Sequence, residues 1–327
     1  MSFRDAGPAA LREDARAVPT PAPARAARRV GVLRRVRRRL PARKIAPYLF
    51  ILPNLAIFLT FTIWPAFNGL NISLYDSSNG RVFRYVGLDN YSRIVHDATF
   101  STVVRNTAIF VVCFVVLVTV LAIVVAVGLN AQVRGKAFFR ASFFLPVLLS
   151  PVVVGLIWNW ALNRQVGLVN TVLANLGLGQ PGWLVGSGLA MVCTIFVAIW
   201  IHLGFYTMIV LSGLQGIDRT VYEAARVDGA SGWQTFRRIT LPLLRPTTMV
   251  VVILATINGF QAFDFIFTLT GGGPVGATTL IVQFIYEQAF ESPIRYGLAS
   301  AAGVMLFAVI FGVTAINYLT GRRREAL

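Results

Sequence analysis

The sequence predicts an all-α integral membrane protein with six transmembrane helices and a cytoplasmic helix–turn–helix loop. Of its 327 residues, 56% are hydrophobic and 13% are charged, which is about half the charged fraction of an ordinary soluble domain. Apolar runs long enough to cross a bilayer recur along the chain, since a hydrocarbon layer of about 30 Å takes roughly 20 helical residues. These observations exclude a soluble globular fold.

The predicted membrane domain covers residues 45–320 and contains six apolar segments. They lie at 47–72, 103–130, 138–162, 187–213, 247–270 and 298–320. Pro146 and Pro151 fall inside the third segment and should bend it or interrupt its hydrogen bonds. The glycine-rich stretch 167–188 is too broken to span and suits an interfacial or re-entrant piece.

The predicted tails are residues 1–44 and 321–327. The net charge is +17, and thirteen of the thirty Lys and Arg residues precede residue 45. This first tail is rich in Ala and Pro and nearly lacks aromatic residues, so we expect it to be disordered. Beside a first membrane span, such a tail anchors the topology and binds anionic membrane lipid. We expect no nucleic-acid partner.

The distribution of Lys and Arg predicts the orientation. One side of the six segments collects 24 of them and the other collects six. The positive-inside rule therefore places both termini in the cytoplasm. The first apolar segment has no small-x-small cleavage site after it, so it reads as a retained span and not as a signal peptide. We expect a multi-pass protein of a bacterial plasma membrane.

The loop between the fourth and fifth segments reads as a short helix, a glycine turn and a second short helix. Thr220 with Glu223, and Ser231 with Gln234, have the spacing of capping boxes. Gly229 lies where a helix should end in a left-handed residue. An amphipathic cytoplasmic loop of no special function would explain each of these signals alone.

The joint pattern of this loop is more specific. It contains Glu223-Ala224-Ala225, Asp228-Gly229-Ala230, the aromatic Trp233 and Phe236, and an Ile239…Pro242…Pro246 ending. This pattern resembles the EAA loop of permease subunits from binding-protein-dependent ABC importers. We expect Pro242 to stop the second helix and Pro246 to lie in the first turn of the next span.

The resemblance covers nearly everything after residue 45. The segments 86–91, 138–146, 270–274 and 285–297 resemble those of the carbohydrate type, the maltose or glycerol-phosphate-like permeases. The resemblance implies the transport of a sugar, an oligosaccharide or a polyol. The Arg-rich tail lies outside it.

The resemblance also implies partners and a role for the loop. Its short helix would dock on a separate ATPase subunit dimer, with Ala224 and Ala225 allowing close approach. Glu223 would supply a charge and Gly229 the turn, and Asp228, Ala230 and Pro242 belong to the same ATPase-docking loop. The other implied partners are a second homologous permease subunit, giving a heterodimer, and an extracytoplasmic solute-binding protein.

Catalytic and cofactor motifs are missing from the sequence. Gly271-x-x-x-x-Gly276-Ala277-Thr278 imitates a phosphate-binding loop, but Ala277 stands where the lysine is required. We therefore expect ATP and Mg²⁺ to bind to the partner ATPase, and this chain to be a translocation subunit that is not itself an enzyme. The two cysteines, Cys113 and Cys193, lie in apolar runs and predict neither a disulfide nor a metal site.

The fifth segment carries the candidate substrate path. Asn258, Gln261 and Asp264 recur every third residue beside Phe263 and other aromatic residues. Polar groups within a span are costly and usually face a cavity or a partner, and amides beside aromatic faces suit a hydroxyl-rich solute. Hydrogen bonds between helices are an equally good explanation of these residues. His202 is more simply explained by packing than by ligand binding.

Two other classes of protein remain open at this point. An ion-coupled secondary transporter or channel would explain Asp264 but gives the Glu223 loop no purpose. A membrane scaffold would explain the basic tail alone. Only the importer predicts that a stoichiometric ATPase and a second permease co-purify with the chain.

Overall fold

The computed structural model describes residues 42–78, 80–130 and 135–325. The chain separates into two compact units, residues 1–55 and 56–327, which are described separately. The predicted disordered tail lies outside the described residues, except that residues 42–44 belong to the first helix. The described elements lie in the second unit, except that α1 begins in the first.

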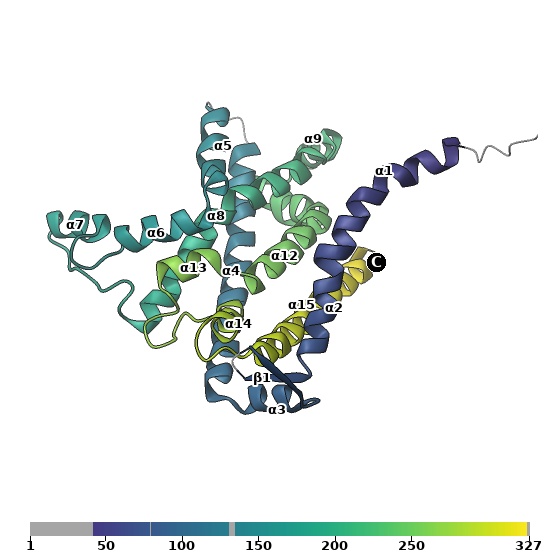
Figure 1. The fold of residues 1–327 in the computed structure, drawn as a ribbon. Coiled ribbons are helices and arrows are strands. Elements are labelled where there is room, and N and C mark those ends of the chain that lie inside the picture. The colour runs from purple at the N-terminus through teal and green to yellow at the C-terminus, as the bar shows by residue number, and fades with distance from the viewer. Residues whose placement is uncertain (1–41, 79, 131–134, 326–327) are drawn as a thin grey trace, which may run out of the picture. The chain divides into compact units, whose positions relative to one another are not determined.

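The described elements are mostly helices, joined by short π and 3-10 segments and one β-hairpin (Figure 1). In chain order they are α1 (Ala42–Phe58), η1 (Leu59–Ile63), α2 (Trp64–Ile72), β1 (Tyr75–Ser78), β2 (Val82–Tyr85), α3 (Asp89–His96), α4 (Ala98–Asn130), α5 (Lys136–Phe144), η2 (Leu145–Leu148), α6 (Pro151–Ala161), α7 (Leu168–Asn175), α8 (Ser187–Gln215), α9 (Arg219–Val227), α10 (Gly232–Thr235), η3 (Phe236–Thr240), α11 (Leu241–Leu243), α12 (Arg245–Phe260), α13 (Asp264–Leu269), α14 (Ile281–Phe290) and α15 (Tyr296–Glu325).

Four of the described helices are continuous, long and apolar enough to cross a membrane. They are Phe50–Ile72, Ala98–Asn130, Ser187–Gln215 and Tyr296–Thr320. Two bent helix pairs bring the possible number of spans to six: Ala137–Leu148 with Pro151–Ala161, and Gly232–Leu243 with Arg245–Phe260. The predicted helical membrane fold is therefore confirmed, with spans one, two, four and six as single runs.

The third predicted span is bent by 100°. Pro146 lies in the 3-10 turn η2, and Pro151 opens α6 after an extended Ser150. Each proline removes a backbone donor, and Pro151 occupies a first-turn position where that donor is not needed. The bend that these prolines predict is confirmed.

The fifth predicted span, 247–270, is wrong as one continuous helix. The helix α12 ends at Phe260, and α13 begins at Asp264 after Phe263 takes φ −149° and ψ −58°. The short α13 packs along α6, where the Thr268 hydroxyl donates to the Val152 carbonyl at 3.0 Å. Gly155 gives α13 the room to do so, because a Cβ there would collide with Thr268. Packing on α6 thus overrides the local helical pattern.

The core of the bundle lies between α4, α8 and α12. Its largest fully buried side chains there include Phe110 and Phe114 of α4 and Tyr206 of α8. Gly259 of α12 lies against Val111 and Phe114, so the two helices approach closely, as small residues allow in membrane bundles. The outer faces of the helices instead carry many exposed apolar side chains, which suits contact with hydrocarbon.

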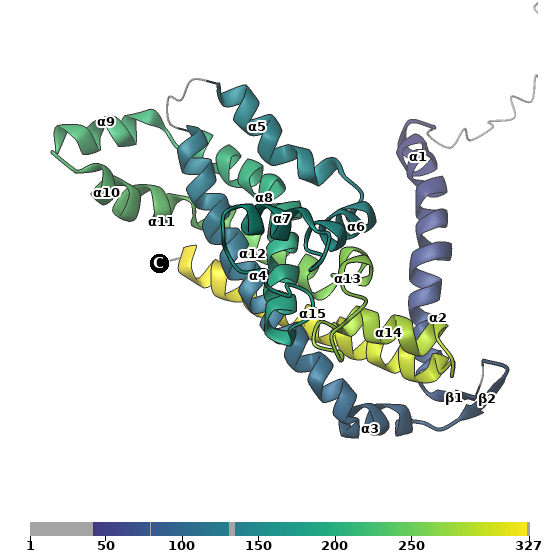
Figure 2. The same ribbon diagram turned by 90° about the vertical axis from the view of Figure 1, so that its left-hand side faces the viewer.

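The hairpin and α3 form a small layer that the sequence did not predict. Tyr75 pairs with Tyr85 in the antiparallel ribbon. The fully buried Asn90 of α3 donates to the carbonyls of Ser73 and Tyr75, at 2.9 Å each. Figures 1 and 2 place this layer at the end of the bundle opposite to α9, α10 and α11. The two sets of loops therefore lie at opposite ends.

Candidate functional site

The candidate site is the loop from Gly216 to Leu244, which we call the coupling loop. Figure 2 shows α9 beside the α10–α11 segment as a projection from one end of the bundle. The helix α8 leads into it and α12 leads out of it. The loop is therefore connected directly to two long helices of the bundle.

The first helix of the coupling loop begins differently from the prediction. Its N-cap is Asp218, whose side chain accepts a 2.9 Å hydrogen bond from the backbone N–H of Thr220. The predicted capping box of Thr220 with Glu223 is wrong, because Thr220 is already inside the helix. Hydrogen bonds from the Thr220 backbone, and then from its hydroxyl, lower the pKa of Asp218. The carboxylate is thus kept charged at the positive end of the helix dipole.

The turn at Gly229 closes α9 as predicted. Gly229 has φ +73°, and its N–H donates to the Arg226 carbonyl at 3.1 Å. The Ala230 N–H donates to the Ala225 carbonyl at 2.9 Å. This pair of bonds is a Schellman motif, which satisfies the last carbonyls of a helix and reverses the chain.

The second helix has the predicted start and a different end. The Ser231 hydroxyl accepts from the Gln234 N–H at 3.3 Å, and the Gln234 side chain accepts from the Ser231 N–H at 2.8 Å. This confirms the capping box. Pro242 does not stop the helix, because the π turn η3 leads without a break into α11, which contains Pro242. A π turn absorbs one extra residue. Pro246 lies in the first turn of α12, as predicted.

Both helices of the coupling loop are tied together on their inner faces. The Tyr222 hydroxyl lies 3.3 Å from the Thr240 hydroxyl. Ala225 is 5% exposed and belongs to this interior. The sequence placed both alanines at a partner surface, and Ala225 instead packs within the chain.

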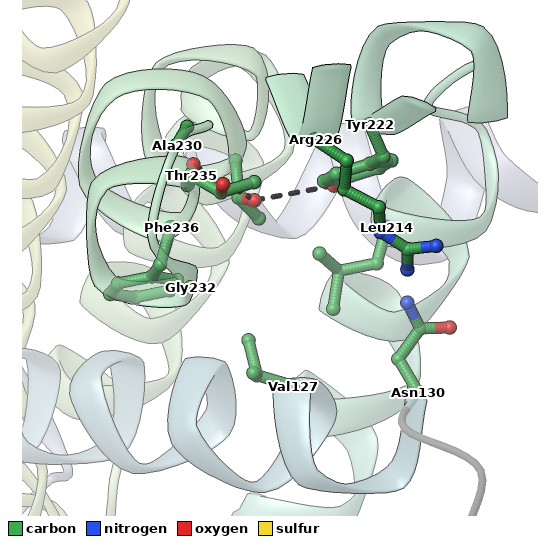
Figure 3. Close-up of a pocket in the computed structure, with 10 residues that line it drawn as sticks. Val127, Asn130, Leu214, Tyr222, Arg226, Ala230, Gly232, Thr235 and Phe236 are labelled. Carbon is green, nitrogen blue, oxygen red and sulfur yellow. Dashed lines mark hydrogen bonds between the residues drawn. The ribbon is translucent and has the colours of Figure 1, made fainter. Parts of the chain in front are cut away.

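A cavity of about 520 Å³ lies between the coupling loop and the ends of α4 and α8. Figure 3 shows Arg226 and Tyr222 on one side of it, Phe236 on another, and Val127 and Asn130 of α4 below. The side chain of Arg226 extends towards the Asn130 amide (Figure 3). A second cavity of about 620 Å³ shares Asn130, Tyr222 and Arg226 and is also lined by Glu223.

The outer face of the coupling loop is open. Glu223, Ala224 and Asp228 are exposed. Val227 is 88% exposed and Trp233 is 69% exposed. Large apolar side chains so open on a polar projection mark a surface suited to another protein.

The candidate substrate residues are not brought together as one helical stripe. Asn258 of α12 donates to the Tyr206 hydroxyl of α8 at 2.8 Å, which is the interhelical hydrogen bond that the sequence left open. Gln261 and Asp264 are exposed on either side of the break between α12 and α13, and Phe263 lies within it. His202 is packed, with its ring centroid 5.5 Å from that of Phe114.

An aromatic cluster beside this break was not predicted. Phe263 lies 5.4 Å from Phe267 and 5.1 Å from Tyr286, between ring centroids, and Tyr286 lies 5.1 Å from Phe290. Tyr286 and Phe290 belong to α14, more than twenty residues further along the chain. Only the tertiary fold could bring them to Phe263.

The loop that imitates a phosphate-binding motif is held by its own hydrogen bonds. The hydroxyls of Thr270 and Thr278 lie 2.7 Å apart. Asn106 of α4 donates to the Gly276 carbonyl at 2.9 Å. The loop thus joins α13 to α14 across α4.

Nearby, burial and the charge of Glu291 raise the pKa of Glu287, against a 3.0 Å hydrogen bond from Gln283.

The fold and the coupling loop together define a class: a bundle of membrane helices that carries a structured helix–turn–helix projection at one end. Residues 118–326 match the family of binding-protein-dependent transport system inner membrane components. The chain belongs to this family. It is an inner membrane permease subunit of a transport system, and the match gives no support to an ion-coupled secondary transporter.

Several relatives align over most of their length. The trehalose/maltose transport system permease protein MalF of Thermococcus litoralis is 36% identical over 282 residues, which are 85% of this chain and 94% of the relative. The multiple sugar-binding transport system permease protein MsmF of Streptococcus mutans is 35% identical over 85% of this chain and 96% of its own. The sn-glycerol-3-phosphate transport system permease protein UgpA of Agrobacterium fabrum is 31% identical, over 84% and 94%.

The fold is also that of a solved structure. A chain in the crystal structure of a bacterial ABC transporter involved in the import of the acidic polysaccharide alginate superposes with a TM-score of 0.76. The two sequences are 24% identical, over 86% of this chain and 96% of the other. The helical bundle described above is therefore an ABC permease fold.

The turn at Gly229 gives a testable prediction. Gly229→Ala places a Cβ in the left-handed region, which costs roughly 1–2 kcal/mol. Hydrogen exchange at the Ala230 amide should then be roughly tenfold faster. Gly229→Asn is the matched control, because asparagine tolerates this conformation. Equal exchange in wild type and Gly229→Ala would show that the Schellman turn does not hold the loop.

Proposed function

We propose that this chain is the translocation subunit of an ATP-driven importer of a sugar, an oligosaccharide or a polyol. The observation that carries the proposal is the coupling loop, whose helices are joined by hydrogen bonds on the inner side and whose outer face is exposed. Its inner face is fixed by the Gly229 turn and the Tyr222–Thr240 contact. Its outer face presents Glu223 and Ala224. A loop that transmits movement from one protein to another needs both a fixed inner face and an exposed outer face.

The partner of the coupling loop is a dimer of ATPase subunits, which bind ATP and Mg²⁺. Ala224 is the small exposed residue that allows close approach, and Glu223 beside it supplies the charge. Ala225, Gly229 and Ala230 act inside the loop, where they keep α9 in place. Asp228 lies exposed at the end of α9, and Pro242 lies in the segment that leads to α12. Closure of the ATPase dimer would move α8 and α12 together.

We infer that the coupling loop and both termini lie in the cytoplasm. The charge asymmetry of 24 against six Lys and Arg residues supports this orientation. The hairpin end of the bundle then faces outwards, where a solute-binding protein would dock. A second homologous permease completes the pathway, and the Arg-rich tail binds anionic lipid at the inner surface.

The solute path passes the break between α12 and α13. Non-helical backbone at membrane depth is tolerated only where it is buried in protein or lines a water-filled cavity. Gln261 and Asp264 are exposed at this break, and Phe263 joins the aromatic cluster beside it. Amide and carboxylate groups next to aromatic faces suit a hydroxyl-rich solute. Asn258 supports this site through its hydrogen bond to Tyr206.

The sugar and polyol-phosphate relatives support the solute class. Their sequences align over 84–85% of this chain and 94–96% of their own length. The coupling loop alone would fit an importer of any solute, so the class rests on the relatives and on the chemistry of the break.

The role of Glu223 can be tested directly. In the reconstituted complex with its ATPase, Glu223→Ala should lower solute-stimulated ATP hydrolysis and uptake by at least tenfold, because a charge at the docking surface is lost. Membrane insertion should not change. Thr320→Val, an exposed residue of α15 outside the coupling loop, is the control. Full activity of Glu223→Ala would remove this residue from the coupling surface.

The solute path makes a second prediction. Gln261→Leu and Asp264→Asn should each raise the solute concentration at half-maximal uptake about tenfold. This is the usual loss of affinity when one polar partner of a bound solute is removed. ATPase activity without solute should stay at the wild-type level. Thr320→Val, at the far end of α15, is a control. If both variants transported with wild-type affinity, the solute would pass elsewhere.

A further inference from the structure

The short helix α13 depends on a second helix, α6, for its position. It has only six residues, Asp264–Leu269, and a helix of this length is marginal without tertiary contacts. Figures 1 and 2 both show α13 beside α6, and α6 is its main neighbour in the bundle. The side chains of Phe265, Ile266 and Leu269 are buried. The contacts with α6 therefore decide where α13 lies.

Three residues on one face of α6 meet α13. Val152, Gly155 and Asn159 are three and four residues apart, so they lie along the same side of the helix. The Val152 carbonyl accepts the Thr268 hydroxyl at 3.0 Å, and Gly155 leaves room for that side chain. The Asn159 amide donates to the Leu269 carbonyl at 2.7 Å. The two helices are thus joined at two points along α13.

The Leu269 carbonyl needs a donor from outside its own helix. Leu269 is the last residue of α13, and the last carbonyls of a helix have no partner within it. The next two backbone donors, the N–H groups of Thr270 and Gly271, bond instead to the Ile266 carbonyl at 3.0 and 3.2 Å. The Asn159 amide therefore supplies the hydrogen bond that holds the end of α13.

The opposite face of α13 belongs to the candidate solute path. Phe267 comes two residues after the buried Phe265, so it points to the other side of the helix, and it is 40% exposed. Its ring centroid lies 5.4 Å from that of Phe263 and 5.3 Å from that of Tyr286. Asp264 is exposed at the start of the same helix. One face of α13 is fixed on α6, and the other carries groups of the path.

We propose that Asn159 is a positioning residue for the solute path. It acts through α13: by holding the end of this helix on α6, it fixes Asp264 and Phe267 at the place where the solute passes. The inference rests on the proposed function, because the path through the α12–α13 break is part of that proposal. A purely structural role would lower the amount of folded protein and leave the affinity of the folded protein for its solute unchanged.

The hydrogen bond is tested in the purified full-length chain without any solute. Asn159→Leu removes the amide donor, and leucine has room there because Asn159 is exposed on α6. Amide exchange at Thr270 and Gly271, followed by mass spectrometry, should become about fivefold faster, because one hydrogen bond to the end of α13 is lost. Asn159→Gln keeps the donor and should exchange as wild type does. Asn175→Leu, at the exposed end of α7, is the control.

The role in the path is tested by uptake into proteoliposomes that hold the full complex. The probes are maltose, trehalose, raffinose, sorbitol and sn-glycerol 3-phosphate, and the variants are compared on the probes that the wild type takes up. Asn159→Leu should raise the probe concentration at half-maximal uptake about fivefold and leave the maximal rate within about twofold of wild type. Asn159→Gln should restore the wild-type value. Combined with Asp264→Asn, the rise should be about tenfold and not the roughly fiftyfold of two independent losses.

Unchanged exchange at the end of α13 in Asn159→Leu would overturn the proposal. Faster exchange with an unchanged half-maximal concentration, or an equal rise in Asn175→Leu, would also overturn it, because Asn159 would then have a structural role only. A wild-type complex that takes up none of the probes would overturn the proposed function and the solute path with it. The exchange measurement does not depend on uptake, so the two failures are distinguished.

Discussion

The backbone hydrogen bonds that close the turn at Gly229 hold the two helices of the coupling loop in one arrangement. The Ala230 amide reaches back to the Ala225 carbonyl at 2.9 Å, so the last carbonyls of α9 are satisfied within the loop. Ala225 can then pack inwards, and Tyr222 can meet Thr240. Bending the loop would break these contacts together.

A second constraint acts within the membrane. Every buried backbone group there must find a partner, so a helix ends inside the bilayer only where protein or water can receive it. The chain satisfies this rule at the α12–α13 break, where α13 turns onto α6 and Thr268 bonds to the Val152 carbonyl. The same turn exposes Gln261 and Asp264. The irregular backbone and the candidate solute path are consequences of one packing arrangement.

Local signals in the sequence predicted local features well. Ser231 with Gln234 and the left-handed Gly229 depend on neighbours within a few residues, and the structure has both. The N-cap of α9 was misplaced because Asp218 and Thr220 both carry oxygens suited to that role. The break after Phe260 depends on packing against α6, a distant segment, and the burial of Ala225 depends on the tertiary fold of the loop. No pattern within either short segment records such contacts.

The central claim is that the exposed face at Glu223 and Ala224 docks on the ATPase, and cross-linking tests it most directly. Ala224→Cys would be labelled with a maleimide that carries a photoreactive diazirine and irradiated in the active complex, so that the carbene inserts into a bond of any adjacent residue, with Leu88→Cys at the opposite end as the control. The native Cys193 is buried and Cys113 is only partly exposed. We therefore expect little cross-linking from the native cysteines. The account predicts an adduct between this chain and the ATPase chain from position 224 and none from position 88. An active complex that gives no adduct from position 224, or equal adducts from both, would contradict it.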